Sequence, residues 1–510
     1  MNFNNFISPF VIGVATLTVI QPQMVFAQNR QDINIIAKSI TVRIDGREYG
    51  TGVIVNRQGN TYTVLTNWHV VGNEGKQRVT TFDNQSHEIN PSSIQRVGNF
   101  DLAIFEFTAN KNYGIAEIVD EPLTESATIY ITGYPKPRPP IDGRIYQFTE
   151  GYISGINPQE KQGYTLVYTN QTRPGMSGAP ILNSQGKLVG IHGLSEGAEV
   201  EDSETGTTRI TPLTDGYKLG IPINNYLGWA GNNQVATNSN ISNFNQQVDQ
   251  DEVTKNLEID KYIIEGLIYS ELKNHEKAIS EYDQAIKLDP NNTLTYIARG
   301  VSYGELGEYD KAISDYTKVI SLDPNYAVAY NNRGFTYNSL GEYDKAIADY
   351  TKTISLDPNY AVAYNNRGGS YNELGEYQKA IADFTKAINL DPNYATAYNN
   401  RGSTYNSLGE YQKAIPDLTK AINLDPNNAP AYYHRGFSYN NLGEYQKAIA
   451  DFTNAISLDS SYAEAYVMRG LSYISVSQYE KALSDLTNAK SLFIQQGNTE
   501  AVKIIEDILQ

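Results

Sequence analysis

Three short segments of the chain carry side chains that together support nucleophilic chemistry. His69 ends one apolar, strand-like run, Asp101 precedes another, and Ser177 lies in a glycine-rich turn. A serine hydroxyl is a weak nucleophile that needs an imidazole to accept its proton, and the imidazole needs a carboxylate on its other nitrogen. The developing oxyanion needs backbone N–H donors, which a turn with Gly175 close to the serine can present. The three segments therefore supply the groups that this chemistry requires.

The sequences around these residues also resemble a known enzyme family. Residues 66–69 read T-x-x-H, residues 101–103 read D-L-A, and residues 175–180 read G-x-S-G-x-P. Because the three motifs occur together in the order His, Asp, Ser, residues 30–230 resemble the trypsin-like serine peptidases, which have the chymotrypsin double β-barrel fold. The resemblance implies two antiparallel barrels and an activity that hydrolyses peptide bonds.

The same resemblance implies a role for each residue. His69 would be the general base, Asp101 its orienting partner and Ser177 the nucleophile, and the amides of Gly175 and Ser177 would form the oxyanion hole. One residue departs from the pattern: Met176 stands where trypsin-type enzymes have the aspartate that pairs with a new N-terminal ammonium after zymogen cleavage. A thioether cannot form that ion pair. We therefore expect the active site to form on folding, without activation by zymogen cleavage.

Substrate preference depends on the pocket for P1, the residue before the scissile bond. In the family this pocket is lined about five residues before the nucleophile and on the following strand, where this chain has Thr172 and His192. The pair resembles bacterial glutamyl endopeptidases and implies an acidic P1 residue, because histidine can donate to a carboxylate. Two alternatives oppose an acidic P1 residue. His192 can be a core histidine, and the acidic loop that follows it would repel an acidic side chain unless the loop points away or binds a cation. The acidic residues are Glu196, Glu199, Glu201, Asp202 and Glu204.

Short strands are expected to position these residues. Between residues 28 and 230, runs rich in Val, Ile, Thr and Tyr alternate with Gly, Pro, Asn and Asp, which is typical of an all-β domain. Many short strands in one domain predict a sandwich or a pair of barrels. The runs are Ser39–Ile44, Gly52–Asn56, Thr61–Asn67, Leu102–Phe107, Thr128–Gly133, Thr165–Thr169, Gly178–Leu182 and Lys187–His192.

From residue 259 the chain repeats itself with a period of 34 residues. Leu-Asp-Pro begins at residues 288, 322, 356, 390 and 424, and Leu-Asp-Ser begins at 458. This period, with small and aromatic residues at fixed positions, resembles the tetratricopeptide (TPR) family, whose helix pairs stack into a superhelix. We expect a capping helix over 497–510, after seven repeats over 259–496. The repeats start near 259, 293, 327, 361, 395, 429 and 463.

The helix expected to line the concave groove of this superhelix carries repeated asparagines. Position 6 of three successive repeats is Asn332, Asn366 and Asn400. Asparagine is a mediocre helix former, and its amide offers donors and acceptors that suit a peptide backbone. Because similar ladders occur in TPR superhelices that hold extended peptides, we predict a peptide-binding groove at these residues. The alternative is recent duplication, which copies a residue whether or not it binds anything.

Composition narrows the remaining possibilities. The chain has 510 residues, no cysteine and a formal net charge of −17. The negative charge argues against a nucleic-acid partner, which would require a basic surface. The absence of cysteine excludes disulfides, a thiol nucleophile and cysteine-bound zinc or iron–sulfur clusters. We expect neither a metal ion nor another cofactor.

Two segments differ from the expected folded domains. Residues 1–27 contain the apolar run Phe10–Ile20, which is short for a membrane span, and valine and alanine at positions that fit a signal-peptidase site after Ala27. The alternative is an uncleaved anchor or a misassigned start. Residues 231–258 are rich in Asn, Gln and Ser and poor in large apolar residues, which predicts a flexible linker.

Taken together, these patterns predict a multidomain chain: an all-β, chymotrypsin-like double barrel over residues 28–230, then an all-α TPR solenoid. We predict an exported bacterial serine endopeptidase, periplasmic or extracellular, whose repeats bind protein or peptide substrates or partners. Nucleic-acid binding and stable membrane insertion after signal cleavage are not expected. The alternative is a TPR interaction scaffold with an inactive peptidase-like domain, in which Ser177 is an ordinary turn serine.

Overall fold

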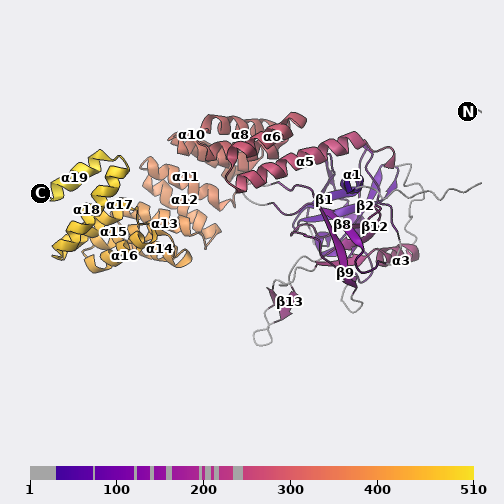
Figure 1. Ribbon diagram of the computed structural model, residues 1–510, viewed down its shortest axis with the longest axis horizontal. Coiled ribbons are helices and arrows are strands. Elements are labelled where there is room, and N and C mark those ends of the chain that lie inside the picture. The colour runs from indigo at the N-terminus through magenta and orange to yellow at the C-terminus, as the bar shows by residue number, and fades with distance from the viewer. Residues whose placement is uncertain are drawn as a thin grey trace, which may run out of the picture. The chain divides into compact units, whose positions relative to one another are not determined.

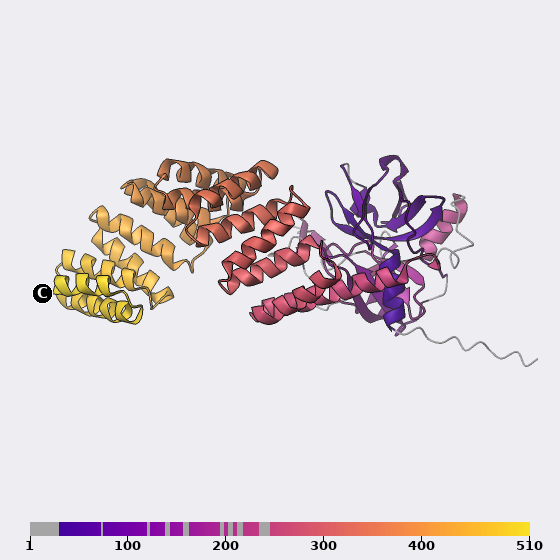
Figure 2. The same cartoon turned by 90° about the horizontal axis from the view of Figure 1, so that it is seen from above.

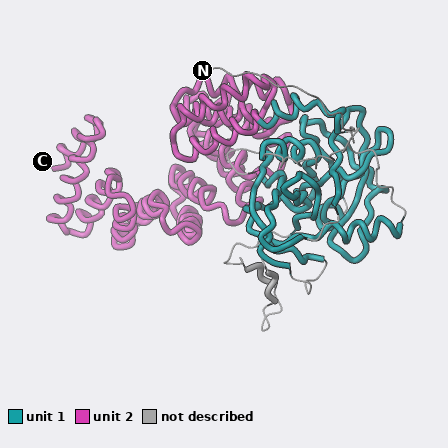
Figure 3. The backbone as a smooth tube through the Cα atoms, turned by 45° about the vertical axis from the view of Figure 1, so that its right-hand side comes forward, with its two compact units in different colours: residues 1–136, 144–257 teal, residues 137–143, 258–510 magenta. Residues whose placement is uncertain are grey.

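The chain folds into two compact units, residues 1–136 with 144–257 and residues 137–143 with 258–510 (Figure 3). Figure 1 labels many of their helices and strands. The signal peptide expected over residues 1–27 lies outside the described residues. The computed structural model describes residues 30–72, 75–119, 123–137, 143–156, 163–193, 198–201, 208–211, 218–233 and 245–509.

The first unit begins with helix α1 (Arg30–Ile40) and an antiparallel sheet. The strands are β1 (Thr41–Asp45), β2 (Gly50–Gln58), β3 (Thr61–Thr66), β4 (Arg78–Thr80), β5 (Ser86–Glu88), β6 (Gln95–Arg96) and β7 (Ala103–Thr108). Their order across the sheet is β5-β4-β1-β2-β3-β7-β6. Thr66 pairs with Ala103, so the end of β3 lies beside the start of β7.

Six further strands of the first unit close into a barrel. They are β8 (Thr128–Gly133), β9 (Gln147–Ile156), β10 (Leu166–Tyr168), β11 (Pro180–Asn183), β12 (Leu188–His192) and β15 (Lys218–Pro222). Their order is β10-β15-β12-β11-β8-β9, and β13 (Ala198–Glu201) and β14 (Thr208–Thr211) form a separate ladder. The expected all-β fold is confirmed, with one closed barrel and, among the described strands, one open sheet in place of the other barrel.

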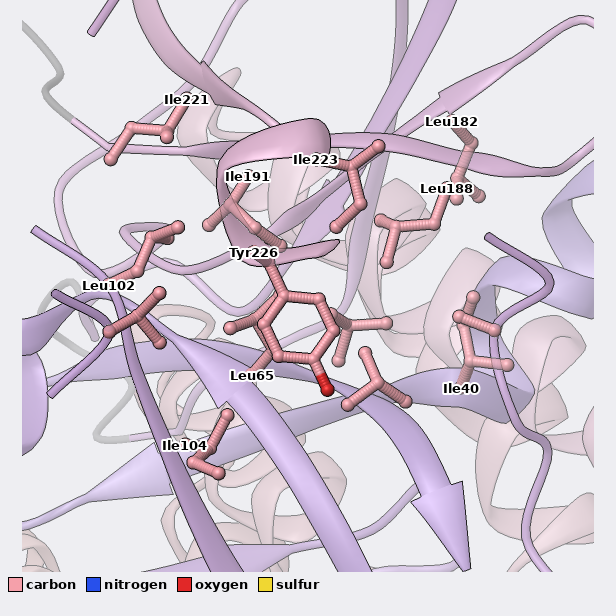
Figure 4. Packing of buried hydrophobic residues seen from close by; sticks show 14 of the residues in the cluster. Ile40, Leu65, Leu102, Ile104, Leu182, Leu188, Ile191, Ile221, Ile223 and Tyr226 are labelled. Carbon is pink, nitrogen blue, oxygen red and sulfur yellow. The ribbon is translucent and has the colours of Figure 1, made fainter. Parts of the chain in front are cut away.

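A buried apolar cluster joins the sheet to the barrel. Leu65 of β3 and Ile104 of β7 pack in one cluster with Ile191 of β12. Tyr226 of α3 (Asn224–Asn232) is 1% exposed, and Figure 4 shows its ring at the centre of these side chains. Because the cluster draws side chains from both β-structures, it fixes the position of the sheet against the barrel.

Residues after the barrel pack back onto the sheet. Val248 and Val253 are buried in the core of the sheet, at the start of α5 (Gln250–Glu271). The Asn245 side chain accepts from the Ile115 backbone N–H at 2.8 Å and donates to the Ile115 carbonyl at 3.0 Å. This segment is therefore anchored by both apolar and polar contacts.

The prediction of a flexible linker over residues 231–258 is therefore wrong for residues 245–258. A few apolar residues at helical spacing are enough to anchor the segment, and the ion pair between Lys111 and Glu252, at 2.6 Å, adds to them. Residues 234–244 lie outside the described part of the chain.

The second unit consists of helix pairs that follow the predicted repeats (Figure 2). After α5 come α6 (His275–Leu288), α7 (Thr293–Glu305), α8 (Tyr309–Leu322), α9 (Ala327–Ser339), α10 (Tyr343–Leu356), α11 (Ala361–Glu373), α12 (Tyr377–Leu390), α13 (Ala395–Ser407), α14 (Tyr411–Leu424), α15 (Ala429–Asn441), α16 (Tyr445–Leu458), α17 (Ala463–Ser475), α18 (Tyr479–Gln495) and α19 (Thr499–Leu509). The expected all-α solenoid is confirmed. Among the described helices, none combines the length and apolar character needed to cross a bilayer.

Small and aromatic residues explain how each pair packs. A Cβ placed on Gly368 of α11 would lie 2.8 Å from the Phe384 ring of α12, so the two helices approach at a glycine. Ala380 and Phe384 are both buried at this contact. At the end of the array, Ile505 of α19 packs in one cluster with Phe493 of α18, as expected of a capping helix.

A repeated arginine ties neighbouring repeats together, a feature that the sequence analysis missed. Arg401 donates from Nε and Nη2 to the two Asp417 carboxylate oxygens, each at 2.7 Å, and from Nη1 to the Thr385 hydroxyl at 2.9 Å. Asp417 lies in the second helix of the same repeat and Thr385 in the preceding repeat. The bidentate pair recurs as Arg299–Asp315, Arg333–Asp349, Arg367–Asp383, Arg435–Asp451 and Arg469–Asp485.

Loss of one such arginine should weaken the array. We expect Arg401→Gln to lower the free energy of unfolding by about 3 kcal/mol, because Asp417 then stays buried without its cation. Urea unfolding of the full chain, followed by far-ultraviolet circular dichroism, measures the loss. The control is Lys413→Gln, which removes the cation of an exposed pair with Glu410 and should leave the transition unchanged. Equal effects of the two substitutions would contradict a special role for the arginine.

Candidate active site

The adjacent ends of β3 and β7 bring His69 and Asp101 together. His69 lies in α2 (Trp68–Val71), just after β3, and Asp101 lies just before β7. His69 Nδ1 and Asp101 Oδ2 are 2.6 Å apart, and the His69 backbone N–H donates to Asp101 Oδ1 at 2.9 Å. The Asn67 side chain donates to the Asp101 carbonyl at 2.8 Å. The predicted pair is thus in contact, and Asp101 is held through both its carboxylate and its backbone.

The surroundings of Asp101 keep its carboxyl group charged. The residue is 5% exposed, and burial alone would raise the pKa of a carboxyl group. Hydrogen bonds from His69 and Tyr164, together with attraction to His69, outweigh burial, so the pKa of Asp101 is lower than its ordinary value. A carboxylate in this position accepts from His69 Nδ1–H and leaves Nε2 free to accept a proton.

A tight turn precedes and presents Ser177. The Met176 N–H donates to the Arg173 carbonyl at 3.1 Å, and Gly175 between them has φ +93°. A proline at the second position and a glycine at positive φ at the third are the signature of a type II turn. The turn ends at Met176, directly before the serine, and therefore sets the direction in which the Ser177 backbone continues.

The residue after the serine must be a glycine. Gly178 has φ +88°, and a Cβ there would lie 2.0 Å from the Thr51 carbonyl oxygen. The Thr51 backbone N–H donates to the Ser177 carbonyl at 2.8 Å, and the Gly178 N–H donates to the His192 carbonyl at 2.8 Å. The nucleophile turn is thereby bonded both to β2 of the sheet and to β12 of the barrel.

Two backbone donors near the serine are unused. Among the described residues, the N–H groups of Gly175 and Ser177 donate to no protein acceptor. The Gly175 carbonyl accepts from the Thr51 hydroxyl at 3.2 Å and from Arg144 Nη2 at 2.8 Å, which anchors the turn. Free N–H groups in an anchored turn are what stabilisation of an oxyanion requires.

The Ser177 hydroxyl bonds to an acceptor that the sequence did not predict. Its Oγ donates to the Gly193 carbonyl at 2.9 Å, and within the described part of the chain no hydrogen bond joins it to His69. The structure thus pairs His69 with Asp101 and engages the serine elsewhere. Contacts between nucleophile and base are often loose without substrate, so this geometry alone does not disqualify the serine.

The two residues predicted to line the substrate pocket hold buried polar atoms without partners. Within the described residues, the Thr172 hydroxyl oxygen and His192 Nε2 are buried and make no hydrogen bond. His192 is 0% exposed, and its Nδ1 lies 2.5 Å from the Tyr168 hydroxyl. Burial, with further lowering by Lys218 and His69, reduces the pKa of His192 to about 3, so the ring is neutral. The Tyr168 hydroxyl also donates to the Leu219 carbonyl at 3.0 Å. If its one proton goes to that carbonyl, His192 Nδ1 donates to the hydroxyl and Nε2 is an unused acceptor; Nε2 is an unused donor only in the other tautomer.

Most of the acidic loop after this strand lies outside the described residues. Glu199 and Glu201 lie in β13, and the described part of the structure covers only their backbone. Glu196, Asp202 and Glu204 lie outside the described residues. That this loop repels an acidic substrate therefore stays a prediction.

A buried arginine that the sequence analysis missed supports the oxyanion turn. Arg144 is 7% exposed and donates to an Asp45 carboxylate oxygen at 3.0 Å. Burial lowers the pKa of Arg144, yet a guanidinium stays protonated in proteins. No motif surrounds it in the sequence, because its partners are mostly main-chain oxygens. These are the carbonyls of Ile44, Gly50, Tyr134, Pro135 and Gly175.

The asparagines predicted to form a peptide groove bond to one another. Asn366 Nδ2 lies 3.4 Å from Asn331 Oδ1, and Asn400 Nδ2 lies 3.1 Å from Asn365 Oδ1, each across two neighbouring repeats. Asn332 Oδ1 accepts within its own repeat from Asn331 at 3.3 Å. These amides therefore link the repeats, a role that the sequence did not predict, while the three at position 6 are only half-buried.

Removal of Arg144 should destabilise the first unit. We expect Arg144→Met to lower the free energy of unfolding by about 3–5 kcal/mol, because Asp45 and the buried carbonyl oxygens lose their donor. Thermal and urea denaturation of the full chain measure the loss. The matched control is Arg43→Met: Arg43 also binds Asp45, at 2.6 Å, but in a more exposed pair, so the expected loss is about 1 kcal/mol or less. A loss as large as that of Arg144→Met would contradict this assignment.

Comparison with known families matches both units. A family described as "Trypsin-like peptidase domain" matches residues 50–191. A family described as "Tetratricopeptide repeat" matches residues 327–360, 361–394, 395–428 and 429–462. A family described as "TPR repeat" matches residues 266–307 and 303–341.

Curated relatives match a limited part of the chain. "Serine protease Do-like HtrA" of Bacillus subtilis (strain 168) is 24% identical over 197 residues, 37% of this chain and 41% of that protein. "Serine protease HtrA-like" of Staphylococcus aureus (strain USA300) is 28% identical over 158 residues, 28% of this chain and 20% of that protein. The chain thus spans less than half the length of these relatives.

Two solved structures with some similarity to this chain are tetratricopeptide repeat proteins. A tetratricopeptide repeat protein from Parabacteroides merdae ATCC 43184 is 23% identical, with a TM-score of 0.41, over 49% of this chain and 99% of that one. YrrB, described as "a TPR protein with an unusual peptide-binding site", is 26% identical, with a TM-score of 0.32, over 38% of this chain and 97% of that one. From the family matches, the chain contains a trypsin-like peptidase domain followed by an array of tetratricopeptide repeats.

Proposed function

We propose that the chain is a serine endopeptidase that hydrolyses peptide bonds through His69, Asp101 and Ser177. The observation that carries the proposal is the contact between His69 Nδ1 and the buried Asp101 carboxylate, 2.6 Å apart. A buried carboxylate held by the ring and the backbone N–H of a histidine and by a tyrosine hydroxyl is costly to build without a use for the second ring nitrogen. The match of residues 50–191 to the trypsin-like peptidase family supports the same reaction class.

The proposed reaction starts when the Ser177 hydroxyl leaves the Gly193 carbonyl and turns to His69. His69 Nε2 takes the hydroxyl proton as Oγ attacks the substrate carbonyl carbon, and Asp101 stabilises the imidazolium that forms. The free N–H groups of Gly175 and Ser177 receive the oxyanion. His69 then gives its proton to the leaving amine, and a water molecule hydrolyses the acyl-enzyme by the same steps.

A second candidate is a TPR interaction scaffold whose peptidase-like domain is inactive. The observation that favours it is the hydrogen bond from Ser177 Oγ to the Gly193 carbonyl, which takes the place of a contact with His69. The two candidates differ in the nucleophilicity of Ser177. An active enzyme forms a covalent adduct with a fluorophosphonate, and an inactive scaffold does not.

We propose that the enzyme prefers an acidic P1 residue. Two buried polar atoms, the Thr172 hydroxyl oxygen and His192 Nε2, lack protein partners among the described residues. A substrate carboxylate can accept from the hydroxyl and, when the ring carries its proton on Nε2, from His192 as well. Lys218 of β15 acts on the same ring, since its charge contributes to the lowered pKa of His192. The positive charge of Lys218 and the unused Thr172 hydroxyl together favour a carboxylate over an apolar side chain.

We propose that the repeats bind protein or peptide substrates or partners and so raise their concentration near the peptidase domain. Asn332, Asn366 and Asn400 are candidates for contacts with the bound segment, because each is half-buried and an amide has more donors and acceptors than the bonds between repeats use. Export to the periplasm or the cell exterior is part of the proposal and rests on the sequence of residues 1–27.

The first test replaces the nucleophile. We expect Ser177→Ala to lose covalent labelling by a fluorophosphonate and to lose peptide hydrolysis by several orders of magnitude, because only binding and oxyanion effects remain. Labelling of the full chain, read by intact mass, measures the adduct. Ser184→Ala, in an exposed turn, is the control and should label like the wild type. A wild-type chain that folds but never labels would favour the scaffold.

The second test concerns substrate preference. We expect His192→Val to reduce the preference for Glu and Asp at P1 by about tenfold or more, because one donor to the substrate carboxylate is lost. Cleavage of a random peptide library by both proteins measures the preference, and thermal denaturation shows whether the variant stays folded. If the profile is the same before and after the substitution, His192 is a core residue and an acidic P1 preference is wrong.

A further inference from the structure

Tyr164 makes a contact with the proposed catalytic pair that no motif indicates. It lies just before β10 of the barrel and is 3% exposed. Its hydroxyl donates to Asp101 Oδ2, the same carboxylate oxygen that contacts His69 Nδ1. One oxygen of Asp101 thus accepts from the histidine on the sheet side and from a tyrosine on the barrel side.

Gly193 makes room for this tyrosine. A Cβ on Gly193 would lie 1.8 Å from Tyr164 Cε1, so any larger residue at that position would displace the ring. The Gly193 carbonyl is also the group that accepts from Ser177 Oγ. Tyr164 therefore packs against the residue that holds the nucleophile and donates to the residue that holds the base.

The charge state of the tyrosine suits it to be a permanent donor. Burial, with the negative charge of Asp101, raises the pKa of Tyr164 far above its ordinary value, so the hydroxyl keeps its proton. Conversely, the bond from Tyr164 is one of the contacts that lower the pKa of Asp101. A donor to a carboxylate also draws electron density from it and weakens its attraction for other cations.

We propose that Tyr164 is a positioning residue that fixes the Asp101 carboxylate and sets the pH at which His69 becomes available as the general base. The inference rests on the proposed function of the His69–Asp101 pair. With the Tyr164 hydroxyl present, Asp101 Oδ2 accepts hydrogen bonds from both Tyr164 and His69. Without that hydroxyl, the carboxylate stabilises the imidazolium form of His69 more strongly. Protonated His69 cannot accept the serine proton, so activity should then require a higher pH.

The groups that titrate or carry charge around this pair are few in the described residues. Asp101 faces His69 and Tyr164, and Tyr168 of β10 acts on Tyr164. His192 of β12 is affected by the charge of His69. Lys218 of β15 acts on His192. His192 has a pKa of about 3 and stays neutral across the range in which a serine peptidase works, so it does not compete as the source of a shift.

The test is the pH dependence of Tyr164→Phe in the full chain. The rate constant for inactivation by diisopropyl fluorophosphate is measured against pH, which needs no known substrate. We expect the acid limb of the profile to move to higher pH by roughly half a unit, with a plateau rate within about tenfold of wild type, because one hydrogen bond to a charged group is lost. The control is Tyr113→Phe, which removes another buried hydroxyl that donates to a carboxylate, that of Asp83, at 3.3 Å.

A second measurement does not depend on activity. The chain has five histidines, so isotope-labelled imidazole signals can be followed by NMR, and His69→Gln assigns the signal of His69. We expect the His69 titration midpoint to be higher in Tyr164→Phe than in wild type and unchanged in Tyr113→Phe. An unchanged midpoint overturns the inference even if the rate falls, because a merely structural tyrosine affects rate and stability only. A wild-type chain that does not react with the fluorophosphate overturns the proposed function and the inference with it.

Discussion

The buried cluster shared by the sheet and the barrel is the constraint on which the site depends. His69 and Asp101 belong to the sheet, and Ser177 follows a turn of the barrel. The chain has no cysteine, so no disulfide holds the two β-structures together. Their alignment follows instead from close packing around Tyr226 and from bonds of Thr51 and Arg144 that cross the same boundary. Close-packed interiors permit little sliding, so a site built across this boundary keeps its geometry.

The contacts that could be predicted from the sequence are those that follow from where a residue stands on an element. His69 and Asp101 meet because adjacent strands end and begin there, and the 34-residue period gave the helix pairs. Contacts made to main-chain oxygens could not be predicted in this way. The bond from Ser177 to the Gly193 carbonyl and those of Arg144 depend on how backbone segments converge in space, which residue types and spacing do not encode.

Two predictions from the sequence, the flexible linker and the peptide-binding asparagines, differ from what the structure shows. Composition over residues 231–258 predicted a flexible linker, yet buried Val248 and Val253 decide the structure of its second half. Conversely, the asparagine ladder was interpreted from the sequence as a surface for ligands, yet the amides bond across repeats, as Arg401 does to Thr385. Residues that repeat with the period are therefore first candidates for contacts between repeats, because every repeat must make them.

The resting contact of Ser177 weighs little in deciding whether the site is active. A hydrogen bond between a hydroxyl and a carbonyl contributes only about 0.5–1.5 kcal/mol, and a bond to the imidazole would replace it. Enzymes lower activation barriers by about 8–23 kcal/mol, so this rearrangement is a minor part of the total. The groups that are costly to arrange, the buried Asp101 carboxylate with its donors and the free amides of Gly175 and Ser177, are already in place. The resting contact of Ser177 therefore does not by itself argue against the proposed function.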